Sequence, residues 1–236
     1  MDSGSLAAPT GSPAAPTASP AAPTGSHRPA RIAAVEAPQP DPALLAALLA
    51  TSGVSAAVSD ALDRRGLALT VPTSTLAPLD GSATAAAAGG RTITLRYLPA
   101  RLTPAAMVAD GGRLMAHRTL FAAATPGDVA LIVGPAAGGA ASLLGGEAAV
   151  VARDAGIAAC LLAGDVRDAD EILASGLAVW CTRRTPATGR YRIEAAEING
   201  PVEVGGVQVR PGDARAGPRG VSRAGSRGLT RAPRAP

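Results

Sequence analysis

Three short apolar runs in the second half of the chain constrain its fold more than any other feature. They cover residues 129–133, 156–162 and 177–181, and each has the length and composition of a buried strand. Helical segments are predicted between them, at 147–155 and 169–174. An order of strand, helix, strand, helix, strand indicates a parallel sheet with right-handed crossovers. The sequence therefore predicts an α/β domain whose ligands bind beyond the carboxyl ends of the strands.

A single domain over residues 41–213 accounts for the other predicted elements. Asp41-Pro42 has the residue types of a helix start, and an extended segment is clearest over 92–98. Alternating valines on either side of Gly205-Gly206 predict a β-hairpin. A chain of 236 residues, of which 47% are apolar, can bury one substantial core.

Residues 1–40 are predicted to form a disordered tail. They repeat a Ser-Pro-Ala-Ala-Pro-Thr unit and contain almost no large apolar side chain. Such a segment cannot offset the conformational entropy that it would lose on ordering. It is either a tether or a dispensable extension, and both interpretations are compatible with its composition.

Residues 214–236 are predicted to form a second disordered tail, which carries most of the basic charge. Seven arginines and one acid lie from residue 210 onward, a net charge of +6, whereas residues 1–209 hold 15 arginines and 17 acids, or −2. Evenly spaced arginines could neutralise RNA phosphates, but few aromatic residues accompany them, so nucleic acid is not the expected partner. The composition of this segment also resembles an out-of-frame reading of a GC-rich gene.

Two motifs that combine glycine with charged residues follow predicted strands. Gly145-Gly146-Glu147 closes a glycine- and alanine-rich loop predicted over 134–146, and Arg167-Asp168 follows the second strand. Glycines leave backbone N–H groups unobstructed, arginine supplies a fixed fork of donors, and aspartate supplies oxygen ligands. The start of a helix is a suitable place for a carboxylate. Together the motifs predict a site at which a small carboxylate meets a hard metal ion.

The residue types that the chain lacks exclude several mechanisms. It has no lysine, which excludes a Schiff-base aldolase, a pyridoxal enzyme and a lysine-containing P-loop. His117 is the only histidine of the domain, and Cys160 and Cys181 are too few for a structural zinc site. A bound metal is therefore expected to be Mg²⁺ or Mn²⁺, held by oxygen ligands.

Each motif also has a purely structural interpretation. Asp168 and Glu171 have the spacing of a capping box, which would only start a helix. Arg167 could pair with Asp165 or Asp170. Glycines before a helix are common in proteins of every function. The residues alone leave these alternatives open.

Cellular location follows from the absence of several signals. No stretch resembles a signal peptide, and no apolar segment reaches the roughly 18 residues of a membrane span. Cys160 and Cys181 do not make a disulfide framework and are expected in the core, and His117 is expected to be a surface or core residue rather than a base. A cytoplasmic protein without membrane contact is predicted.

From about Val58 to Asp213 the chain resembles the RraA-like family. The family signature is a glycine followed some way on by Arg-Asp and then an acid three residues later. Here Gly146 is followed after twenty residues by Arg167, Asp168 and then Glu171. Further matches lie at residues 126–129, 176–179 and 201–213. The resemblance covers most of the domain, and the combined spacing is specific.

This resemblance implies a fold and an activity. The fold would be a swivelling β/β/α sandwich-type single α/β domain, assembled as a homotrimer or hexamer with sites between subunits. The family includes divalent-metal-dependent 4-hydroxy-4-methyl-2-oxoglutarate aldolases, which also decarboxylate oxaloacetate. A lyase that cleaves a C–C bond in a short 2-oxo acid, through a metal-stabilised pyruvate enolate, is therefore expected.

The same resemblance implies the roles of individual residues. Asp168 would hold Mg²⁺ or Mn²⁺, directly or through water. Arg167 would contact the C2 oxygen and the carboxylate of a bound 2-oxo acid. A water near Glu147 would move the proton, and the substrate carboxylate would be received by the backbone of Gly145, Gly146, Glu147 and Ala148.

The chain departs from the family pattern in two places. Ala163-Gly164 stands where many relatives have Asp-Gly, and residues 214–236 lack the hydrophobic strand and acid that usually follow Pro-Gly-Asp. A core strand and a subunit-crossing acid are therefore expected to be missing. The family also contains a regulator that binds and inhibits an RNA-degrading endonuclease, so a non-catalytic regulator and an inactive remnant remain alternatives. Asp168, which regulatory members can lose, favours the enzyme.

Overall fold

The computed structural model of the chain describes its residues in ten stretches, and all of them belong to one compact unit. These stretches are residues 33–34, 37–51, 54–66, 70–71, 75–81, 89–101, 103–109, 115–135, 141–216 and 221–224. Predictions for the rest of the two tails lie outside the described residues. Within the described part of the chain, no helix is long and apolar enough to cross a membrane.

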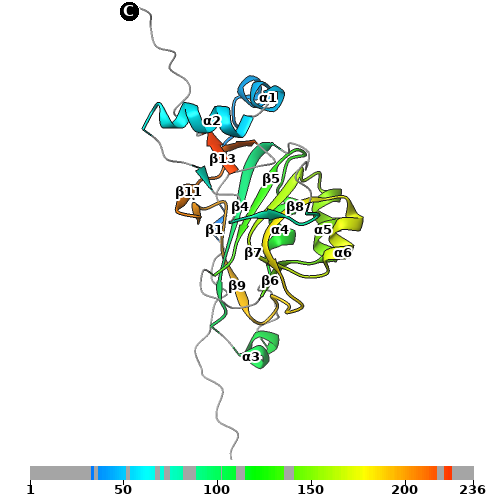
Figure 1. The fold of residues 1–236 in the computed structure, drawn as a ribbon. Helices are drawn as coiled ribbons and strands as arrows, with labels where there is room; N and C mark the ends of the chain where they lie inside the picture. Colours follow the sequence, from blue (N-terminus) through cyan, green and yellow to red (C-terminus); the bar gives the residue numbers. More distant parts are fainter. Residues whose placement is uncertain are drawn as a thin grey trace, which may run out of the picture. The chain divides into compact units, whose positions relative to one another are not determined.

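A sheet of 11 strands forms the centre of this unit (Figure 1). Its strands are β1 (Ala33–Ala34), β2 (Thr70–Val71), β3 (Ala77–Pro78), β4 (Gly90–Pro99), β5 (Val129–Val133), β6 (Ser142–Leu144), β7 (Ala159–Val166), β8 (Ala178–Arg184), β9 (Ile193–Ile198), β12 (Ala214–Ala216) and β13 (Val221–Ala224). The main path runs β2-β13-β12-β4-β5-β7-β8-β3, and β9 pairs with β4, β1 with β9, and β6 with β7. A separate hairpin, as predicted, consists of β10 (Val202–Val204) and β11 (Val207–Val209).

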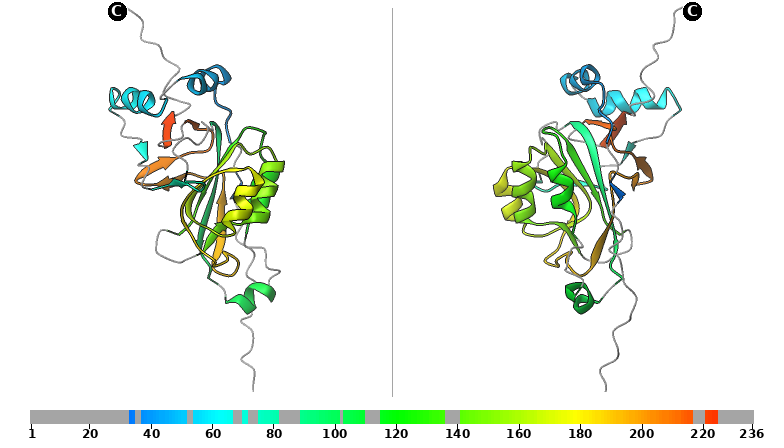
Figure 2. Two further views of the ribbon diagram at one scale, coloured as in Figure 1. Left: turned by 45° about the vertical axis from the view of Figure 1, so that its right-hand side comes forward. Right: turned by 180° about the vertical axis from the view of Figure 1, so that it is seen from behind.

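The predicted order of strand, helix, strand, helix, strand is confirmed. β5 pairs in parallel with β7, and β7 with β8, so that Leu161 lies opposite both Leu131 and Trp180. The crossover helices are α5 (Gly146–Asp154) and α6 (Ala169–Ser175). Together with α4 (His117–Ala122), they cover one face of the sheet (Figure 2).

The region before α5 differs from the prediction. Residues 134–146 were expected to be a loop, but Ser142–Leu144 form β6 and pair in parallel with the end of β7. β7 correspondingly runs to Val166 instead of ending at residue 162, because β6 and β8 both supply backbone partners there. This extra pairing brings the two glycine- and arginine-containing motifs to the same edge.

Three further helices lie outside the crossover units: α1 (Pro42–Ala50), α2 (Val54–Asp63) and α3 (Pro104–Ala109). α1 begins as predicted, because the side chain of Asp41 accepts a hydrogen bond from the N–H of Ala43 at 2.9 Å. α1 contacts β12, and α2 contacts β13.

Both faces of the central strands are buried, which explains why their sequences are continuous apolar runs. Ile132 and Leu162 pack toward α4, α5 and α6. Leu131, Leu161 and Trp180 pack on the opposite side, together with the valines of the β10-β11 hairpin. Successive side chains of a strand point to opposite faces, so each run supplies both layers. The predicted α/β fold with a β/β/α layering is confirmed.

The two cysteines lie in the core, as expected. Burial raises the pKa of the Cys160 thiol to about 12 and also raises the pKa of Cys181. Both are free thiols. Because the thiolate is the reactive form, burial disfavours nucleophilic reactivity at both cysteines.

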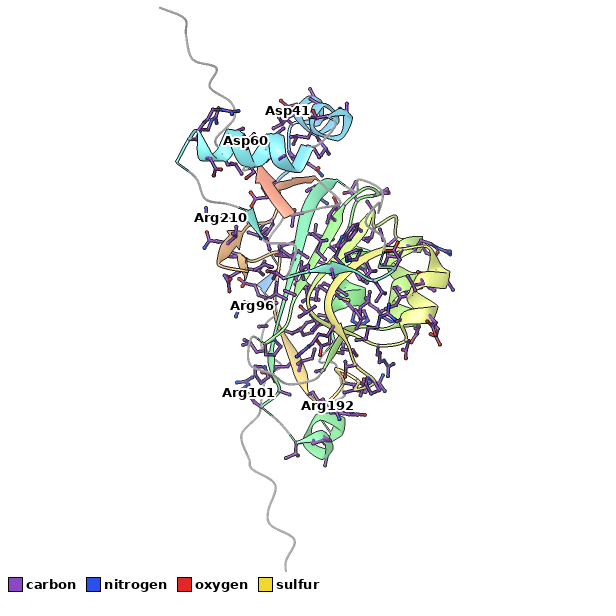
Figure 3. The ribbon with its side chains drawn as sticks, viewed as in Figure 1. Asp41, Asp60, Arg96, Arg101, Arg192 and Arg210 are labelled. Carbon is purple, nitrogen blue, oxygen red and sulfur yellow. The ribbon has the colours of Figure 1, made fainter. Side chains whose placement is uncertain are left out.

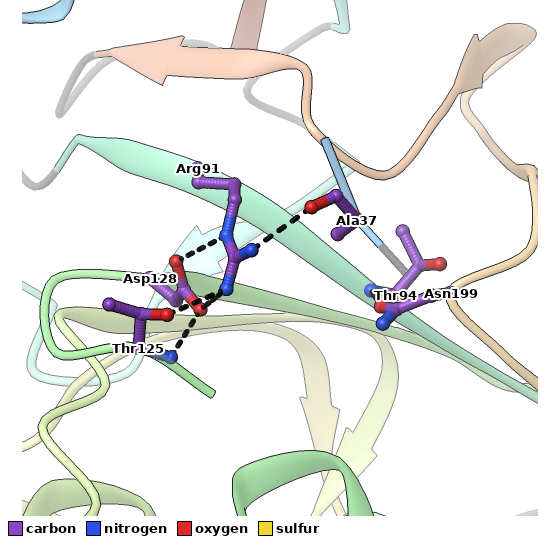
Figure 4. Close-up of polar contacts among 6 residues, drawn as sticks. All are labelled: Ala37, Arg91, Thr94, Thr125, Asp128 and Asn199. Atoms are coloured by element: carbon purple, nitrogen blue, oxygen red, sulfur yellow. Dashed lines mark hydrogen bonds and ion pairs between the residues drawn. The ribbon is translucent and has the colours of Figure 1, made fainter. Parts of the chain in front are cut away.

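A buried ion pair joins the first residues of β4 to the turn before β5 (Figure 4). Arg91 Nε and Nη2 lie 2.8 Å and 2.5 Å from the carboxylate oxygens of Asp128. Arg91 also donates to the carbonyl oxygen of Ala37 at 3.0 Å and to Thr125 Oγ1 at 3.1 Å. This network ties the segment before α1 to the amino-terminal edge of the parallel strands, opposite the edge where ligands are expected.

Other arginines of the domain pair with acids on the surface. On β4 and just after it, Arg96 and Arg101 lie 3.1 Å and 2.8 Å from Glu197 and Glu194 of β9 (Figure 3). Exposed pairs of this kind contribute about 0 to 1 kcal/mol each. They match arginines of the domain with acids, which the chain up to residue 209 holds in nearly equal numbers.

Short strands lie within both segments that the sequence predicts as tails. Ala33–Ala34 pair in parallel with β9, and Ala37 is buried, although residues 1–40 were expected to be disordered. Within the segment 214–236, β12 pairs antiparallel with β4, and β13 pairs with β12 and β2. The sheet thus continues past β4 into the segment where a core strand was expected to be missing. Sheet pairing uses backbone groups, so a composition with few large apolar residues does not exclude it.

Candidate functional site

The two motifs meet because the strands that precede them are paired. Leu144 of β6 lies opposite Val166 of β7, and the N–H of Arg167 donates to the carbonyl oxygen of Leu144 at 3.1 Å. Gly145 and Arg167 are the next residues of their two chains and therefore lie side by side. This placement at the carboxyl end of β7 agrees with the position expected for a ligand site in a parallel sheet.

The glycines allow the motifs to touch. A Cβ atom on Gly145 would lie 3.0 Å from Arg167 Nε and 3.0 Å from Asp168 Oδ2. A Cβ atom on Gly146 would lie 2.0 Å from Glu171 Oε2 and 2.5 Å from Glu171 Cβ. A Cβ contact of 2.0–2.5 Å does not occur in real structures, and one of 3.0 Å is unusually tight, so the side chains of Arg167, Asp168 and Glu171 closely border the space that the two glycines leave open.

Asp168 does not have the conformation of a capping residue. Its backbone is left-handed, with φ 54° and ψ 46°, and its side chain makes no capping hydrogen bond to α6. The expected capping box with Glu171 is therefore wrong. A left-handed backbone costs an L-residue free energy, although aspartate tolerates it better than most, and such outliers cluster at functional sites. The carboxylate of Asp168 remains available to a ligand.

Arg167 has a different partner from those expected. Its Nε lies 3.2 Å from Asp168 Oδ2, and the two side chains are 42% and 37% exposed. Asp165 instead pairs with Arg183 at 3.1 Å, and the side chain of Asp165 is only 6% exposed. The expectation that Arg167 pairs with Asp165 or Asp170 is therefore not supported. Arg167 and Asp168 form a half-exposed pair that a ligand can reach.

The start of α5 offers backbone donors next to this pair. Gly145 is the N-cap residue, it makes no side-chain capping hydrogen bond, and its carbonyl oxygen accepts from the N–H of Ala149 at 3.0 Å. The first N–H groups of a helix, here those of Gly146, Glu147 and Ala148, have no partner inside the helix. The helix dipole adds partial positive charge at the same point. This end of α5 is suited to hold a carboxylate.

Glu147 points away from the Arg167-Asp168 pair toward α4. Its carboxylate forms an ion pair with Arg118, and its side chain is 85% exposed. His117, beside Arg118, has its pKa lowered to about 4, chiefly by burial and then by Arg118, while Glu147 opposes this shift. The imidazole is thus neutral at physiological pH. In the described part of the chain, its buried Nδ1 has no hydrogen-bond partner.

The oxygen ligands suit a magnesium-type ion only if water and substrate complete its coordination. Among the described residues, no group of three or more His, Cys, Asp or Glu side chains is arranged to hold a metal. Asp168 and Glu171 are the carboxylates that lie against the glycines. Mg²⁺ commonly keeps several waters and binds through one or two carboxylates plus substrate oxygens. The residues present fit that mode and do not fit a structural zinc site.

A cavity of about 240 Å³ lies at the same edge of the sheet, on the side of the β10-β11 hairpin. It is lined by residues of β5, β6, β7, β8 and the hairpin, among them Leu143, Asp165 and Arg183. The residues predicted for the site do not line it. Leu143 packs so closely that a Cβ on Gly164 would lie 2.6 Å from its Cδ1.

The fold and the site together define a class of α/β proteins in which an Arg-Asp pair lies against a glycine at the N-terminus of a helix. The family description RraA-like, Aldolase/RraA, matches residues 55–217. The chain belongs to the RraA-like family. This family contains aldolase and decarboxylase enzymes as well as ribonuclease inhibitors, and its members are typically oligomeric.

Solved structures with a similar fold include two proteins described as RraA. Streptomyces coelicolor RraAS2, described as an unusual member of the RNase ES inhibitor RraA protein family, is 27% identical, with a TM-score of 0.63 over 78% of this chain and 86% of that chain. The RNA-processing inhibitor RraA from Thermus thermophilis is 22% identical, with a TM-score of 0.52 over 70% and 90%. A Pseudomonas syringae protein is 18% identical, with a TM-score of 0.61 over 80% and 82%. The last two support the fold alone. No curated protein matches the sequence.

The structure brings most of the predicted site residues together at the start of α5. Gly145, Arg167 and Asp168 form one contact group, and Gly146, the next residue of the chain, lies against Glu171. Ala148 is buried in the first turn of α5, where only its backbone can face a ligand. Glu171 was expected to cap a helix and is also the acid of the family signature, and in the structure it lies against Gly146. The matching of Gly146 and Glu171 in one family signature was the sequence signal for this contact.

Proposed function

We propose that this protein is a divalent-metal-dependent lyase that cleaves a C–C bond in a short 2-oxo acid. Its reactions would be aldol cleavage of substrates like 4-hydroxy-4-methyl-2-oxoglutarate to pyruvate, and decarboxylation of oxaloacetate. The observation that carries this proposal is the contact of Gly145, the residue that starts α5, with Arg167 and Asp168. That contact supports a site with an anion cradle, a fixed cation and an oxygen ligand within a few ångströms of one another.

The start of α5 and Arg167 bind and orient the substrate. The N–H groups of Gly146, Glu147 and Ala148 donate hydrogen bonds to its C1 carboxylate, and Gly145, which has no side chain, leaves this approach unobstructed. Arg167 donates to the C2 oxygen and to the same carboxylate. Two fixed directions of hydrogen bonding hold the 2-oxo acid in one orientation, with its scissile bond away from the helix.

The charges at the site support a bound cation. Arg167, Asp168 and Glu171 carry formal charges of +1, −1 and −1, a net charge of −1 that would repel an anionic substrate. Asp168 is the residue that would hold Mg²⁺ or Mn²⁺, directly or through water. When bound, such an ion supplies Lewis-acid stabilisation of negative charge on the substrate oxygens.

Arg167 stabilises the charge that develops when the C–C bond breaks. The electron pair of that bond moves onto the 2-oxo group, where the C2 oxygen becomes an enolate oxygen beside the guanidinium. An arginine keeps its proton throughout and needs no reorganisation during the step. This chemistry does not require a covalent lysine intermediate, in agreement with a chain that has no lysine.

The proposal includes an assembly and a location. A homotrimer or hexamer in the cytoplasm, with sites between subunits, is proposed from the family. In that arrangement a partner subunit would complete a site that is half-exposed in one chain, as the accessible side chains of Arg167 and Asp168 are here.

Pyruvate release from oxaloacetate, followed with Mg²⁺ or Mn²⁺ and again with EDTA, tests this function. Arg167→Ala is expected to lower kcat/KM by about 10²- to 10³-fold, the usual cost of removing a donor to a developing oxyanion. Arg101→Ala, which removes an exposed arginine that pairs with Glu194, is the matched control and should leave turnover unchanged. Turnover that resists EDTA, or that survives in Arg167→Ala, would exclude the proposed site.

A non-catalytic regulator is the second candidate, because Streptomyces coelicolor RraAS2 is described as a member of an RNase inhibitor family. A regulator would act by binding an RNA-degrading endonuclease and would not need Asp168. Inhibition of such an endonuclease by the purified protein, unchanged in Asp168→Asn, would favour this candidate. Metal-dependent turnover that is lost in Asp168→Asn would favour the lyase.

A further inference from the structure

The cavity on the side of the β10-β11 hairpin lies apart from the proposed lyase site. It has a volume of about 240 Å³ and lies at the carboxyl ends of β5, β7 and β8, which is where open α/β sheets bind ligands. None of the residues assigned to the lyase site lines it. Pockets for drug-sized ligands have volumes of about 300–1,000 Å³, so this cavity suits a smaller metabolite.

One wall of the cavity is apolar and held in place. Leu143 of β6 is packed between two glycines, because a Cβ on Gly134 would lie 3.0 Å from Leu143 Cδ2 and one on Gly164 would lie 2.6 Å from Leu143 Cδ1. Val133 of β5 and Val204 of the hairpin add further apolar surface. This wall can contact an aliphatic group of a ligand.

β7 is irregular where it borders the cavity. Its register with β8 shifts between Leu162 and Asp165. Ala163 and Gly164 lie within this shift, and both line the cavity with little or no side chain. Irregularities of this kind are concentrated next to binding sites, where they re-aim a side chain. Here the shift directly precedes Asp165, which also lines the cavity.

The cavity carries two carboxylates and one guanidinium group. Asp165 Oδ1 lies 3.1 Å from Arg183 Nε, and the side chain of Asp165 is only 6% exposed. Glu203 of the hairpin accepts a hydrogen bond from the N–H of Gly206. The formal charge of the three side chains is −1. Because like charges repel, the cavity disfavours a dianionic 2-oxo acid and favours a ligand that has a positive group.

Asp165 and Arg183 can each bind a further polar group. A carboxylate has several lone-pair sites, and a guanidinium has several N–H donors. Among the described residues, the carboxylate of Asp165 accepts hydrogen bonds from Arg183 alone, one of them long at 3.4 Å, and the guanidinium of Arg183 donates to Asp165 alone. The cavity therefore offers an acceptor for a cation next to a donor for an anion.

We propose that this cavity binds a free α-amino acid with an aliphatic side chain, for which L-leucine is the probe. The ammonium group of the ligand donates to Asp165 and Glu203, and its carboxylate accepts from Arg183. Its side chain lies against Leu143 and Val204. A ligand that lacks one of the two charged groups loses the charge-assisted hydrogen bonds of that group. Binding requires neither a metal ion nor turnover, so it does not depend on the proposed lyase function.

Isothermal titration calorimetry of the full chain with three ligands tests the proposal. L-leucine is expected to bind. 3-Methylbutylamine, which lacks its carboxylate, and 4-methylpentanoate, which lacks its ammonium group, are each expected to bind about 10- to 100-fold more weakly. Oxaloacetate should not displace L-leucine, because the two molecules would occupy separate sites.

Variants of the cavity residues locate the binding. Asp165→Asn, Arg183→Gln and Glu203→Gln are each expected to weaken L-leucine binding by about tenfold or more. Ala163→Leu should abolish binding, because the added side chain fills the cavity. Arg190→Gln alters an exposed arginine that does not line the cavity and is the matched control. Circular dichroism checks the fold of each variant, and the exposed Glu203 and Arg183 decide the outcome if Asp165→Asn does not fold.

Four results would overturn the proposal. They are the absence of L-leucine binding at millimolar concentrations, equal binding of L-leucine and either analogue, displacement of L-leucine by oxaloacetate, and unchanged affinity in both Arg183→Gln and Glu203→Gln. Selective binding of L-leucine that is lost in these two variants, and kept in Arg190→Gln, supports it. If L-leucine binds in this way but oxaloacetate is not decarboxylated, the lyase function fails and the amino-acid site stands.

Discussion

Asp168 directs its Oδ2 to within 3.2 Å of Arg167 Nε, while its own backbone is left-handed at φ 54°. The two residues are adjacent in sequence, yet their side chains converge because the chain reverses direction between β7 and α6. The same turn places both against Gly145 of a different crossover. A cation and a carboxylate are thus fixed together at the start of α5, which is the arrangement that the proposed reaction requires.

The first prediction concerns metal binding by Asp168. Asp168→Asn keeps a residue that tolerates a left-handed backbone and removes the charge, so Mn²⁺ affinity is expected to fall by at least about tenfold without loss of fold. Isothermal titration calorimetry measures the affinity, and circular dichroism checks the fold. Asp154→Asn, at the other end of α5, should leave the affinity unchanged. Equal Mn²⁺ affinity in Asp168→Asn and the parent would remove Asp168 from the site.

The second prediction concerns the contact between Gly146 and Glu171. Gly146→Ala forces a Cβ into the position of Glu171 and is expected to lower the free energy of unfolding by about 1–3 kcal/mol. In a Glu171→Gly background the same change should cost clearly less, because the clashing side chain is gone. Urea denaturation of the four proteins gives the coupling energy. A cost that does not depend on residue 171 would contradict the observed contact.

The third prediction concerns the buried pair of Arg91 and Asp128, whose side chains are 9% and 4% exposed. Arg91→Ala leaves a buried carboxylate without its partner and is expected to destabilise the fold by about 3–5 kcal/mol. Replacing both residues, as Arg91→Met with Asp128→Leu, should cost less than Arg91→Ala alone. Chemical denaturation measures both values. Similar stability of Arg91→Ala and the parent would argue against a buried, hydrogen-bonded pair.

The fourth prediction concerns acid stability and His117. The pKa of this side chain is lowered from 6.5 to about 4 in the folded protein, so the unfolded chain binds a proton more readily between these values. The contribution of His117 to the free energy of unfolding is therefore fully present above pH 6.5. It decreases by up to about 3 kcal/mol as the pH falls toward 4. Unfolding free energies at several pH values should reveal this slope. His117→Phe should flatten it, and an unaltered slope in that variant would assign it to other groups.

Local patterns predicted the elements whose signals are confined to a few consecutive residues. The apolar runs around Leu131, Leu161 and Trp180 became β5, β7 and β8, because strands buried on both faces need a continuous apolar sequence. The helix start at Asp41 and the hairpin at Gly205-Gly206 were equally local. In each case the physical cause, whether a cap, a turn or a burial pattern, lies within the segment itself.

Other features depended on partners distant in sequence and could not be predicted in this way. β6 has three residues within a glycine-rich stretch and exists through its pairing with β7. β12 consists of small and basic residues and is ordered along β4 through backbone pairing. Asp168 has the sequence spacing of a capping residue, but its left-handed backbone excludes that role. Short-range preference is weak compared with pairing and packing of this kind.

The sequence by itself determined the order of strands and helices, the absence of lysine chemistry, and the residue types of the site. Only the tertiary structure decided which carboxylate lies beside the glycines at the start of α5. Glu147 and Glu171 have the same functional group, and their spacing from the glycines does not distinguish them. The pairing of β6 with β7 places α5 against α6, so that Glu171 lies on Gly146 while Glu147 turns to Arg118. Side-chain chemistry is encoded residue by residue, whereas the distances that make it a site depend on how separate chain segments pack.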